Sequence, residues 1–388
     1  MDTELRQNGM AKKGRMMTAV FFILSGILAA TWASRIPDIQ EKLGLGNAAW
    51  GTVLFAAPAG LVCGLLVASR LTAEFGSKKI LISSSILSCV FLVLAGFGTE
   101  RFQLMIILFL MGFMRTILNI SANTLSLEVQ NMYSKSIIST FHGLWSLACF
   151  VAASIGTLMI VNNVLPRFHF LLIAIVCLLT SLIFYKSPVG NKEVSIEKKP
   201  FFVRPDSYLF HLGLVAFCAM ICENAMFDWS VNYFEKAVQA GKGLVTAGYT
   251  SFIISMTLGR LLGDRIIGYF GHMKVLLYSG LLISGGFILA SIFPFPVTAI
   301  AGFVLVGIGD SIIVPIVYAL SGKTKKMPTG YAISAVTMIG YAGFLTGPLL
   351  IGFVSGALSL QWAFGILSVF GILISFLSFK IRSFKELN

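Results

Sequence analysis

The sequence predicts an all-α membrane protein with twelve transmembrane helices in two six-helix, pseudo-symmetric bundles. The first observation is composition: of 388 residues, 57% are hydrophobic and only 12% are charged, about half the charged fraction of a soluble globular domain. The second is a series of long apolar runs, and the third is an internal repeat. A β-barrel is disfavoured, because barrel strands are alternating segments of ~10 residues, whereas these runs are longer and do not alternate.

Twelve mostly apolar runs reach the length of about 20 residues that a membrane-spanning helix needs. The polar N-terminus shows no cleavable pattern, and the first run is too long for a signal-peptide core, so we expect that run to be retained as a helix. The runs cover approximately residues 16–37, 47–69, 80–98, 102–126, 137–163, 168–186, 207–234, 244–267, 275–293, 297–321, 329–355 and 360–380.

Lysine and arginine are distributed unevenly among the segments between these runs. Of the 29 Lys and Arg residues, most fall in the N-terminus, the C-terminus and every second loop. This asymmetry favours an even number of spans with both termini in the cytoplasm. We therefore expect an integral multi-pass protein of the bacterial inner membrane, surrounded by the lipid bilayer. The net charge of +13 then reflects membrane orientation, and no nucleic-acid partner is expected.

The longest polar interruption, residues 187–206, contains prolines near both ends and a net basic middle. It predicts a cytoplasmic linker between an N-terminal bundle, residues 1–186, and a C-terminal bundle, residues 207–388. Twenty residues are too few for a stable domain of their own.

Three motifs recur in the two halves of the chain. Each pair is separated by about 196 residues, and a constant offset of this kind is typical of the internal repeats of transporter folds. The matching positions are Gly76 and Gly271 after the second and eighth runs, Trp32 and Trp229 at the ends of the first and seventh, and Trp145 and Tyr341 in the fifth and eleventh.

Five short motifs show a resemblance to a known family over essentially the whole chain. The chain resembles the major facilitator superfamily and, within it, the bacterial fucose-permease-like transporters. The motifs are WASRIP (32–37), FHGLWS (141–146), ENAMFDWS (223–230), GRLLGDR (259–265) and GYAGFLTGP (340–348).

This resemblance implies a two-lobed secondary transporter with a central cavity, alternating access and no enzymatic activity. It implies proton-coupled symport of a small polar solute such as a sugar. The chain departs from the family pattern in the loop after the second run, where Ser69 replaces a glycine and Ala73 an acid. It also carries Asn119 where fucose-permease-type transporters have a glutamate.

Three acidic residues lie well inside apolar runs: Glu223, Asp228 and Asp310. A carboxylate near the middle of a bilayer costs roughly 2.5 kcal/mol or more, so it rarely lies there without a partner or a task. We interpret all three as proton-coupling candidates, with Glu223 as the proton carrier. The alternatives are a fixed ion pair for Glu223 and a capping or outer-gate role for Asp228.

Polar residues of the fourth run predict a wet cavity wall. Arg115, Asn119 and Asn123 follow one another at a spacing of four residues, which places them on one helix face. We expect Arg115 to face one cavity with Glu223. The alternatives are a permanent ion pair of Arg115 with Glu223 or Asp310, and helix-to-helix hydrogen bonds for the asparagines.

The remaining site candidates fall into two groups. With the stripe above, the substrate-binding candidates are His142, Trp145, Trp229 and Tyr341. A lone histidine such as His142 is usually a packing residue, and its titration range leaves a switch or shuttle role open. The gating candidates are Arg35, Lys78, Lys79, Arg260, Asp264 and Arg265, and of these the family resemblance implies an inner gate at Arg260, Asp264 and Arg265. Arg35 is open to interpretation as an outer-gate residue or an interfacial charge.

Enzyme chemistry finds little support in the sequence. It contains no GxxxxGK[ST] phosphate loop, HExxH, GxSxG or paired CxxC motif, and the spacing of its six cysteines is not that of a metal site. We therefore expect no metal, no cofactor and a monomer whose partners are its solute, protons and lipid. The alternative functions are efflux of amphipathic compounds on the same fold and a non-transporting membrane sensor.

Overall fold

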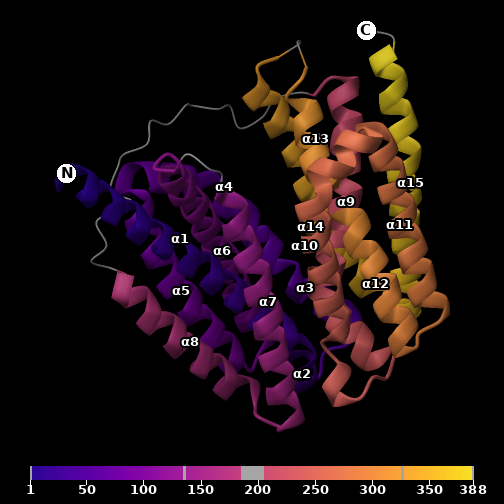
Figure 1. The fold of residues 1–388 in the computed structure, drawn as a ribbon. Coiled ribbons are helices and arrows are strands. Elements are labelled where there is room, and N and C mark those ends of the chain that lie inside the picture. The colour runs from indigo at the N-terminus through magenta and orange to yellow at the C-terminus, as the bar shows by residue number, and fades with distance from the viewer. Residues whose placement is uncertain (1, 134–136, 185–204, 325–326, 387–388) are drawn as a thin grey trace. The chain divides into compact units, whose positions relative to one another are not determined.

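The computed structural model describes residues 2–133, 137–184, 205–324 and 327–386, and that part of the chain contains helices and no β-strand (Figure 1). The all-α class predicted from the sequence is therefore confirmed. Most of the predicted linker, residues 187–206, lies outside the described residues, so its conformation stays a prediction.

The chain separates into two compact units. The first contains Met1–Gly44 and Ala56–Glu197, and the second contains Leu45–Phe55 and Lys198–Asn388. The short segment 45–55 thus groups with the second unit, although it belongs to the N-terminal half of the sequence.

The helices of the first unit correspond to the first six predicted spans. They are α1 (Asp2–Ser34), α2 (Ile36–Lys42), α4 (Ala56–Phe75), α5 (Ser77–Phe97), α6 (Arg101–Gln130), α7 (Ile138–Val161) and α8 (Pro166–Ile183). Helix α1 begins well before the predicted start of the first span, because the polar N-terminal residues continue the same helix.

The second unit contains the last six predicted spans and one short helix from the first half of the chain. Its helices are α3 (Asn47–Leu54), α9 (Ser207–Lys236), the single turn η2 (Lys242–Leu244), α10 (Ala247–Phe270), α11 (His272–Ile292), α12 (Pro296–Asp310), α13 (Ile313–Ser321), α14 (Thr329–Ala357) and α15 (Leu360–Glu386).

The same helix pairs make the main contacts in both units. In the first unit α1 packs on α7, α4 on α6, and α5 on α6 and α8. In the second unit the helices at matching positions pack in the same way: α9 on α14, α10 on α12, and α11 on α12 and α15. This recurrence is the structural counterpart of the sequence repeat.

Glycines at matching positions make the same turn in both units. Gly76 between α4 and α5 has φ of 85°, and Gly271 between α10 and α11 has φ of 77°. Such positive φ values are readily adopted only by glycine. The repeat first seen as two similar sequence motifs is therefore a repeated backbone conformation.

Proline interrupts two of the predicted spans. The second span divides at Phe55 into α3 and α4, and the tenth divides at 311–312 into α12 and α13. Pro58 lies four residues after Leu54, the last residue of α3, and Pro315 lies four residues after Ser311, the residue that follows α12. Each proline lacks the N–H that would continue the helix hydrogen bonds. Pro348 lies inside α14 without ending it.

Glycine contact explains why α3 groups with the second unit. A Cβ on Gly51 would lie 2.5 Å from the Pro348 carbonyl oxygen and 2.8 Å from the Gly352 Cα of α14. Only glycine permits so close an approach of two helix backbones, which is a common device of membrane helices.

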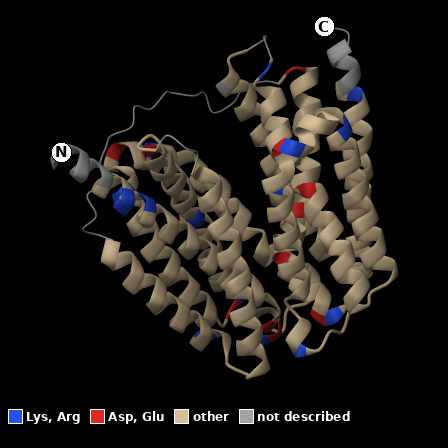
Figure 2. Cartoon of the chain, in the orientation of Figure 1, with Lys and Arg blue, Asp and Glu red and all other residues tan. Residues whose placement is uncertain are grey.

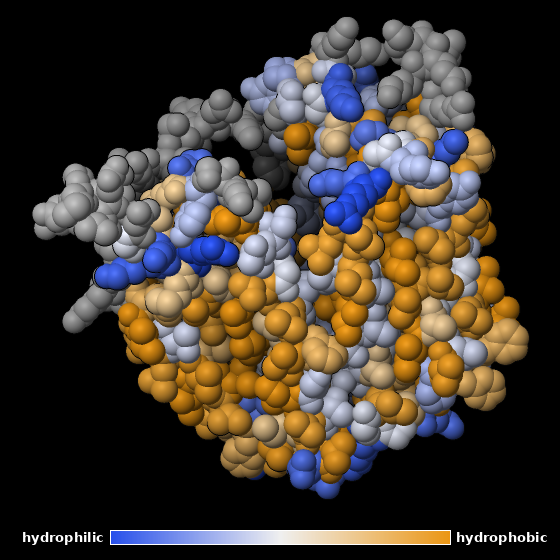
Figure 3. Space-filling model, in the orientation of Figure 1, coloured by the Kyte–Doolittle hydropathy of each residue, from blue (hydrophilic) through white to orange (hydrophobic). Residues whose placement is uncertain are grey.

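In the described residues, eleven helices are long and apolar enough to cross a membrane. The exception among the twelve predicted spans is α10, whose 24 residues have sufficient length but include Arg260, Asp264 and Arg265. Charged residues gather at helix ends in both units, and acidic residues also lie part-way along helices of the second unit (Figure 2). The visible surface along the helices is largely hydrophobic (Figure 3).

Candidate functional site

Helix α9 carries two of the three predicted membrane acids. The Asp206 carboxylate starts the helix by accepting a hydrogen bond from the Leu209 backbone N–H at 2.9 Å, the usual arrangement of an N-cap. Helix α9 is the most deeply buried of the candidate spans. A carboxylate on it therefore needs a partner from a neighbouring helix.

Glu223 finds that partner in Arg260 of α10. The Arg260 Nη2 lies 3.2 Å from the Glu223 Oε1, and the exposed fractions of the two side chains are 43% and 13%, respectively. Arg260 was predicted as a gating residue and Arg115 as the counter-charge of Glu223. The ion pair to Arg260 is the interaction that sequence reasoning missed.

Arg260 also reaches the interruption between α12 and α13. Its Nε donates to the Ser311 backbone carbonyl at 3.3 Å. In a continuous helix this carbonyl would accept from residue 315, but proline there has no N–H to donate. The guanidinium of Arg260 therefore joins α9 to a carbonyl that Pro315 leaves free.

Asp310 is the last residue of α12 and lies directly before the interruption. It is 3% exposed, and its Oδ1 has no hydrogen-bond partner among the described residues. Asp310 lies within electrostatic range of both Glu223 and Arg260. We call Glu223, Arg260 and Asp310 the charged triad; it combines two carboxylates with one guanidinium.

Two tyrosines lie close to the charged triad. Tyr318 of α13 and Tyr341 of α14 are both within electrostatic range of Glu223. Tyr341 was a predicted substrate-binding residue, whereas Tyr318 was not predicted. Tyr318 could have been predicted from its position in the same span as Asp310. It follows Asp310 by eight residues, which is about two helical turns.

Asp228 is hydrogen-bonded to a residue of its own helix. Asn224 Nδ2 donates to Asp228 Oδ2 at 3.0 Å, one helical turn apart. Asn224 is 4% exposed, and its Oδ1 lies 2.9 Å from the position of a Cβ on Gly347 of α14. Trp229, next along the chain, is completely buried. These contacts are those of a packed helix interface.

The polar stripe on α6 lies in the first unit. Arg115 and Asn123 are exposed and Asn119 is half-buried. Asn123 Nδ2 donates to the Asn119 backbone carbonyl at 2.8 Å, so this asparagine bonds within its own helix. Among the described residues Arg115 makes no ion pair. Because Arg115 and Glu223 belong to different units, the shared cavity stays a prediction.

The predicted candidates of α7 lie on a partly open face of that helix. His142 is exposed, and its ring meets the Phe22 ring edge to face at 5.1 Å between centroids. Trp145 is half-buried. Both residues therefore remain accessible enough for the substrate contact that was predicted.

Arg35 is a buried residue that links two connecting segments inside the first unit. It is 1% exposed, its Nε lies 3.1 Å from Asp38 Oδ2, and its Nη2 donates to the Val164 carbonyl at 2.7 Å. This arrangement joins the α1–α2 connection to the α7–α8 loop.

The remaining gating candidates lie at helix ends or on exposed faces. Lys78 is half-buried and Lys79 exposed in the first turn of α5, and Asp264 and Arg265 are exposed on α10. In the described residues, no group of three or more His, Cys, Asp or Glu side chains is arranged to hold a metal ion.

Comparison with known proteins identifies similar chains. The family model described as Major Facilitator Superfamily matches residues 16–328. An uncharacterized MFS-type transporter of Yersinia pestis is 30% identical over 94% of this chain and 95% of that protein. The uncharacterized transporter y4wD of Sinorhizobium fredii is 27% identical over 93% and 96%.

Solved structures show the same fold at low identity. A mutant of the nucleoside transporter NupG aligns with a TM-score of 0.76 at 12% identity, covering 96% of this chain and 99% of that one. A bacterial homolog of the human lysosomal transporter Spinster, inward-facing and unoccupied, gives 0.76 at 13% identity, covering 97% and 98%.

Proposed function

Since this chain belongs to the Major Facilitator Superfamily and is an integral multi-pass membrane transporter, we propose that it moves a small polar solute by alternating access and couples this movement to protons. The proposed solute class is sugar-like. At 12–14% identity, the structural relatives support the fold and not a substrate. The coupling proposal rests on the charged triad.

The observation that carries the proposal is the buried Asp310 carboxylate, whose Oδ1 has no hydrogen-bond partner among the described residues, beside an ion pair that already uses Arg260. Two carboxylates and one guanidinium leave one negative charge without a counter-charge. An isolated ionised carboxylate away from water is costly, and a bound proton is the smallest group that removes the charge. The triad therefore has the composition of a site that gains and loses one proton.

Exchange of partners by Arg260 supplies the proposed link to conformation. When Glu223 takes up a proton, its charge disappears and the ion pair between Arg260 and α9 is lost. Asp310 is then the remaining carboxylate with which Arg260 can pair. Arg260 also holds the Ser311 carbonyl, so the exchange acts directly on the α12–α13 interruption. Coupling follows only if the inward- and outward-open states bind the proton with different affinity.

Uptake by purified protein in proteoliposomes tests the coupling. Glu223→Gln and Asp310→Asn should each abolish uphill, pH-driven accumulation and leave solute counterflow largely intact, because counterflow needs no net proton movement. The matched control is Glu100→Gln, an exposed glutamate before α6. If Glu223→Gln accumulates solute as the parent does, with unchanged proton uptake, then Glu223 forms only a fixed ion pair.

Counterflow against a solute panel tests the substrate class. Exchange of sugars or nucleosides supports the proposal, and nucleosides belong in the panel because they contain a pentose. Exchange of amphipathic dyes or drugs alone would instead indicate efflux. Absence of exchange with every compound, in protein that remains folded, would indicate a non-transporting role.

A further inference from the structure

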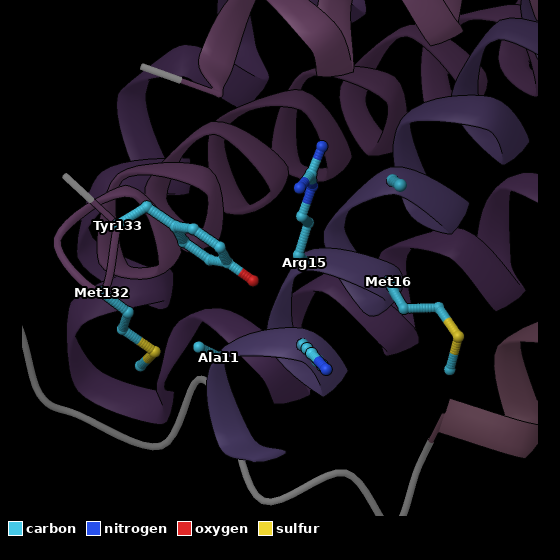
Figure 4. Close-up of a pocket in the computed structure, with 7 residues that line it drawn as sticks. Ala11, Arg15, Met16, Met132 and Tyr133 are labelled. Atoms are coloured by element: carbon cyan, nitrogen blue, oxygen red, sulfur yellow. The ribbon is translucent and has the colours of Figure 1, made fainter. Parts of the chain in front are cut away.

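A pocket of about 510 Å³ opens at the N-terminal end of the first span. The described residues that line it all belong to the first unit: they come from one face of α1, together with Met132 and Tyr133 just beyond the end of α6 (Figure 4). On α1 the lining positions include Lys12, Arg15, Met16 and Ala19, which share one face because three- and four-residue steps return to the same side of a helix. None of the charged-triad residues lines this pocket.

The lining of the pocket combines two cations with apolar side chains. The Arg15 guanidinium carbon lies 5.8 Å from the centroid of the Tyr133 ring, within range of a cation–π contact. Figure 4 shows Tyr133 directed toward the helix that carries Ala11 and Arg15. Met16 and Met132 are 56% and 41% exposed, and Figure 4 shows them on opposite sides of Arg15. Among the described residues that line the pocket, none is acidic.

The two cations have no carboxylate partner in the described part of the chain. The ion pairs there involve Arg35, Arg70 and Arg260 only, and Lys12 and Arg15 are both exposed. Their charge is thus available to an anion from outside the protein. Arginine suits a phosphate group because its planar guanidinium donates two parallel hydrogen bonds.

The position of the pocket along the first span points to lipid. The apolar run of the first span covers approximately residues 16–37, so Lys12 and Arg15 lie directly before it, at the level where a membrane helix passes through the headgroup region. Basic pockets between membrane helices at this level are suited to acidic headgroups. A volume of about 510 Å³ is larger than inorganic phosphate needs, and the exposed methionines offer an apolar wall to the glycerol and upper acyl carbons.

We propose that this pocket binds the headgroup of an anionic phospholipid. Lys12 and Arg15 hold the phosphate, the Tyr133 ring fixes the Arg15 guanidinium, and Met16 and Met132 contact the apolar part of the lipid. This lipid site is separate from the proposed solute pathway, so either proposal can fail without the other.

Native mass spectrometry of the full chain, released from mixed phosphatidylglycerol and phosphatidylcholine, tests the site. The parent should retain phosphatidylglycerol selectively. Each removed cation should weaken that retention about fivefold, since a basic residue near an acidic lipid surface contributes about 1 kcal/mol. We therefore expect this loss for Lys12→Gln and for Arg15→Gln.

Lys13→Gln is the matched control, because Lys13 is the exposed neighbour of Lys12 and does not line the pocket. It should leave phosphatidylglycerol retention unchanged. Tyr133→Phe keeps the ring and should also retain the lipid. Equal loss from Lys13→Gln would show diffuse surface attraction and overturn the site, and so would equal retention of both lipids by the parent.

Competition distinguishes a lipid from a free anion. Inorganic phosphate and glycerol 3-phosphate at millimolar concentration should displace phosphatidylglycerol only weakly, because they lack the apolar contacts. Complete displacement by inorganic phosphate, with the same dependence on Arg15, would assign the pocket to a free phosphate and overturn the lipid proposal. Size-exclusion profiles of all variants confirm that each is folded.

Discussion

At the scale of single residues, the second unit concentrates its charge chemistry around one guanidinium. Arg260 pairs with Glu223 at 3.2 Å and donates to the Ser311 carbonyl at 3.3 Å, while Asp310 lies buried nearby with one oxygen unsatisfied in the described part of the chain. Removing Arg260 would leave two carboxylates close together without a counter-charge. That situation is costlier than removing the whole pair.

Stability measurements on a double-mutant cycle test this arrangement. Arg260→Gln should lower the free energy of unfolding by about 1–2 kcal/mol, a modest value because the guanidinium is partly exposed. Adding Glu223→Gln should recover part of the loss, since the uncompensated charge disappears. The thermal midpoint of protein in detergent reports both effects. Strictly additive losses would show that the two side chains are not coupled.

Arg35 provides a second test at the residue scale. Arg35→Gln removes a buried cation, its ion pair to Asp38 and its bond to the Val164 carbonyl. The expected destabilisation is about 2 kcal/mol, below that of a fully buried pair because Asp38 is partly exposed. Arg35→Lys should recover little, since an ammonium cannot donate in the same fork. A Lys variant with parental thermal stability would contradict this account.

At the scale of the elements, proline determines where two spans are interrupted. Pro58 separates α3 from α4, and Pro315 separates α12 from α13 next to Asp310. At Pro315 the interruption also has chemical consequences, because it frees the carbonyl that Arg260 binds. Pro348 lies inside α14 without ending it, so a proline in a span does not by itself predict an interruption.

Substitution of Pro315 tests the role of the interruption. Pro315→Ala supplies the missing N–H, so the Ser311 carbonyl can accept within the helix and no longer needs Arg260. We expect folded protein with uptake reduced severalfold. The reason is that a change of partner by Arg260, from Glu223 to Asp310, would no longer act on α12 and α13 through the Ser311 carbonyl. The matched control is Pro296→Ala at the first turn of α12, where the missing N–H has no helix partner anyway. Equal effects of both changes would exclude a specific role for Pro315.

At the scale of the whole molecule, the repeat and the membrane orientation are the main features. The same helix pairs pack in each unit, and positive-φ glycines recur at matching positions. Orientation with both termini in the cytoplasm follows from the distribution of Lys and Arg and stays a prediction.

The exposed cysteine, Cys63, can be replaced by serine, and the five other cysteines are buried, so single labelling sites are easily introduced.

Labelling from one side of the membrane checks the orientation. In a Cys63→Ser background, Lys12→Cys and Lys242→Cys place one thiol before the first span and one between the seventh and eighth. A membrane-impermeant maleimide added to intact cells should label position 242 and spare position 12 until the membrane is opened. Labelling of both positions in intact cells would refute the predicted topology.

Much of the fold followed from the sequence because its signals are local. Apolar runs of spanning length, the constant repeat offset and the buried acids Glu223, Asp228 and Asp310 are read directly along the chain. Two helices do not follow their hydropathy. Helix α10 has full length, but its charged residues lower its hydropathy, and α1 extends further toward the N-terminus than its apolar run.

Composition, repeats and short motifs along the chain are enough to predict the fold class, the family and the candidate acids of this transporter. The pairing of Glu223 with Arg260, the bond from Arg260 to the carbonyl freed by Pro315, and the place of Tyr318 near the same carboxylate become known only from the packing of the helices. These contacts join four different helices, and side-chain partners across helices depend on how each helix is rotated and packed. The spacing of residues within one helix does not reveal how that helix is rotated against its neighbours. Hydropathy and internal repeats, in contrast, can be recognised from the sequence without knowledge of which helices are neighbours.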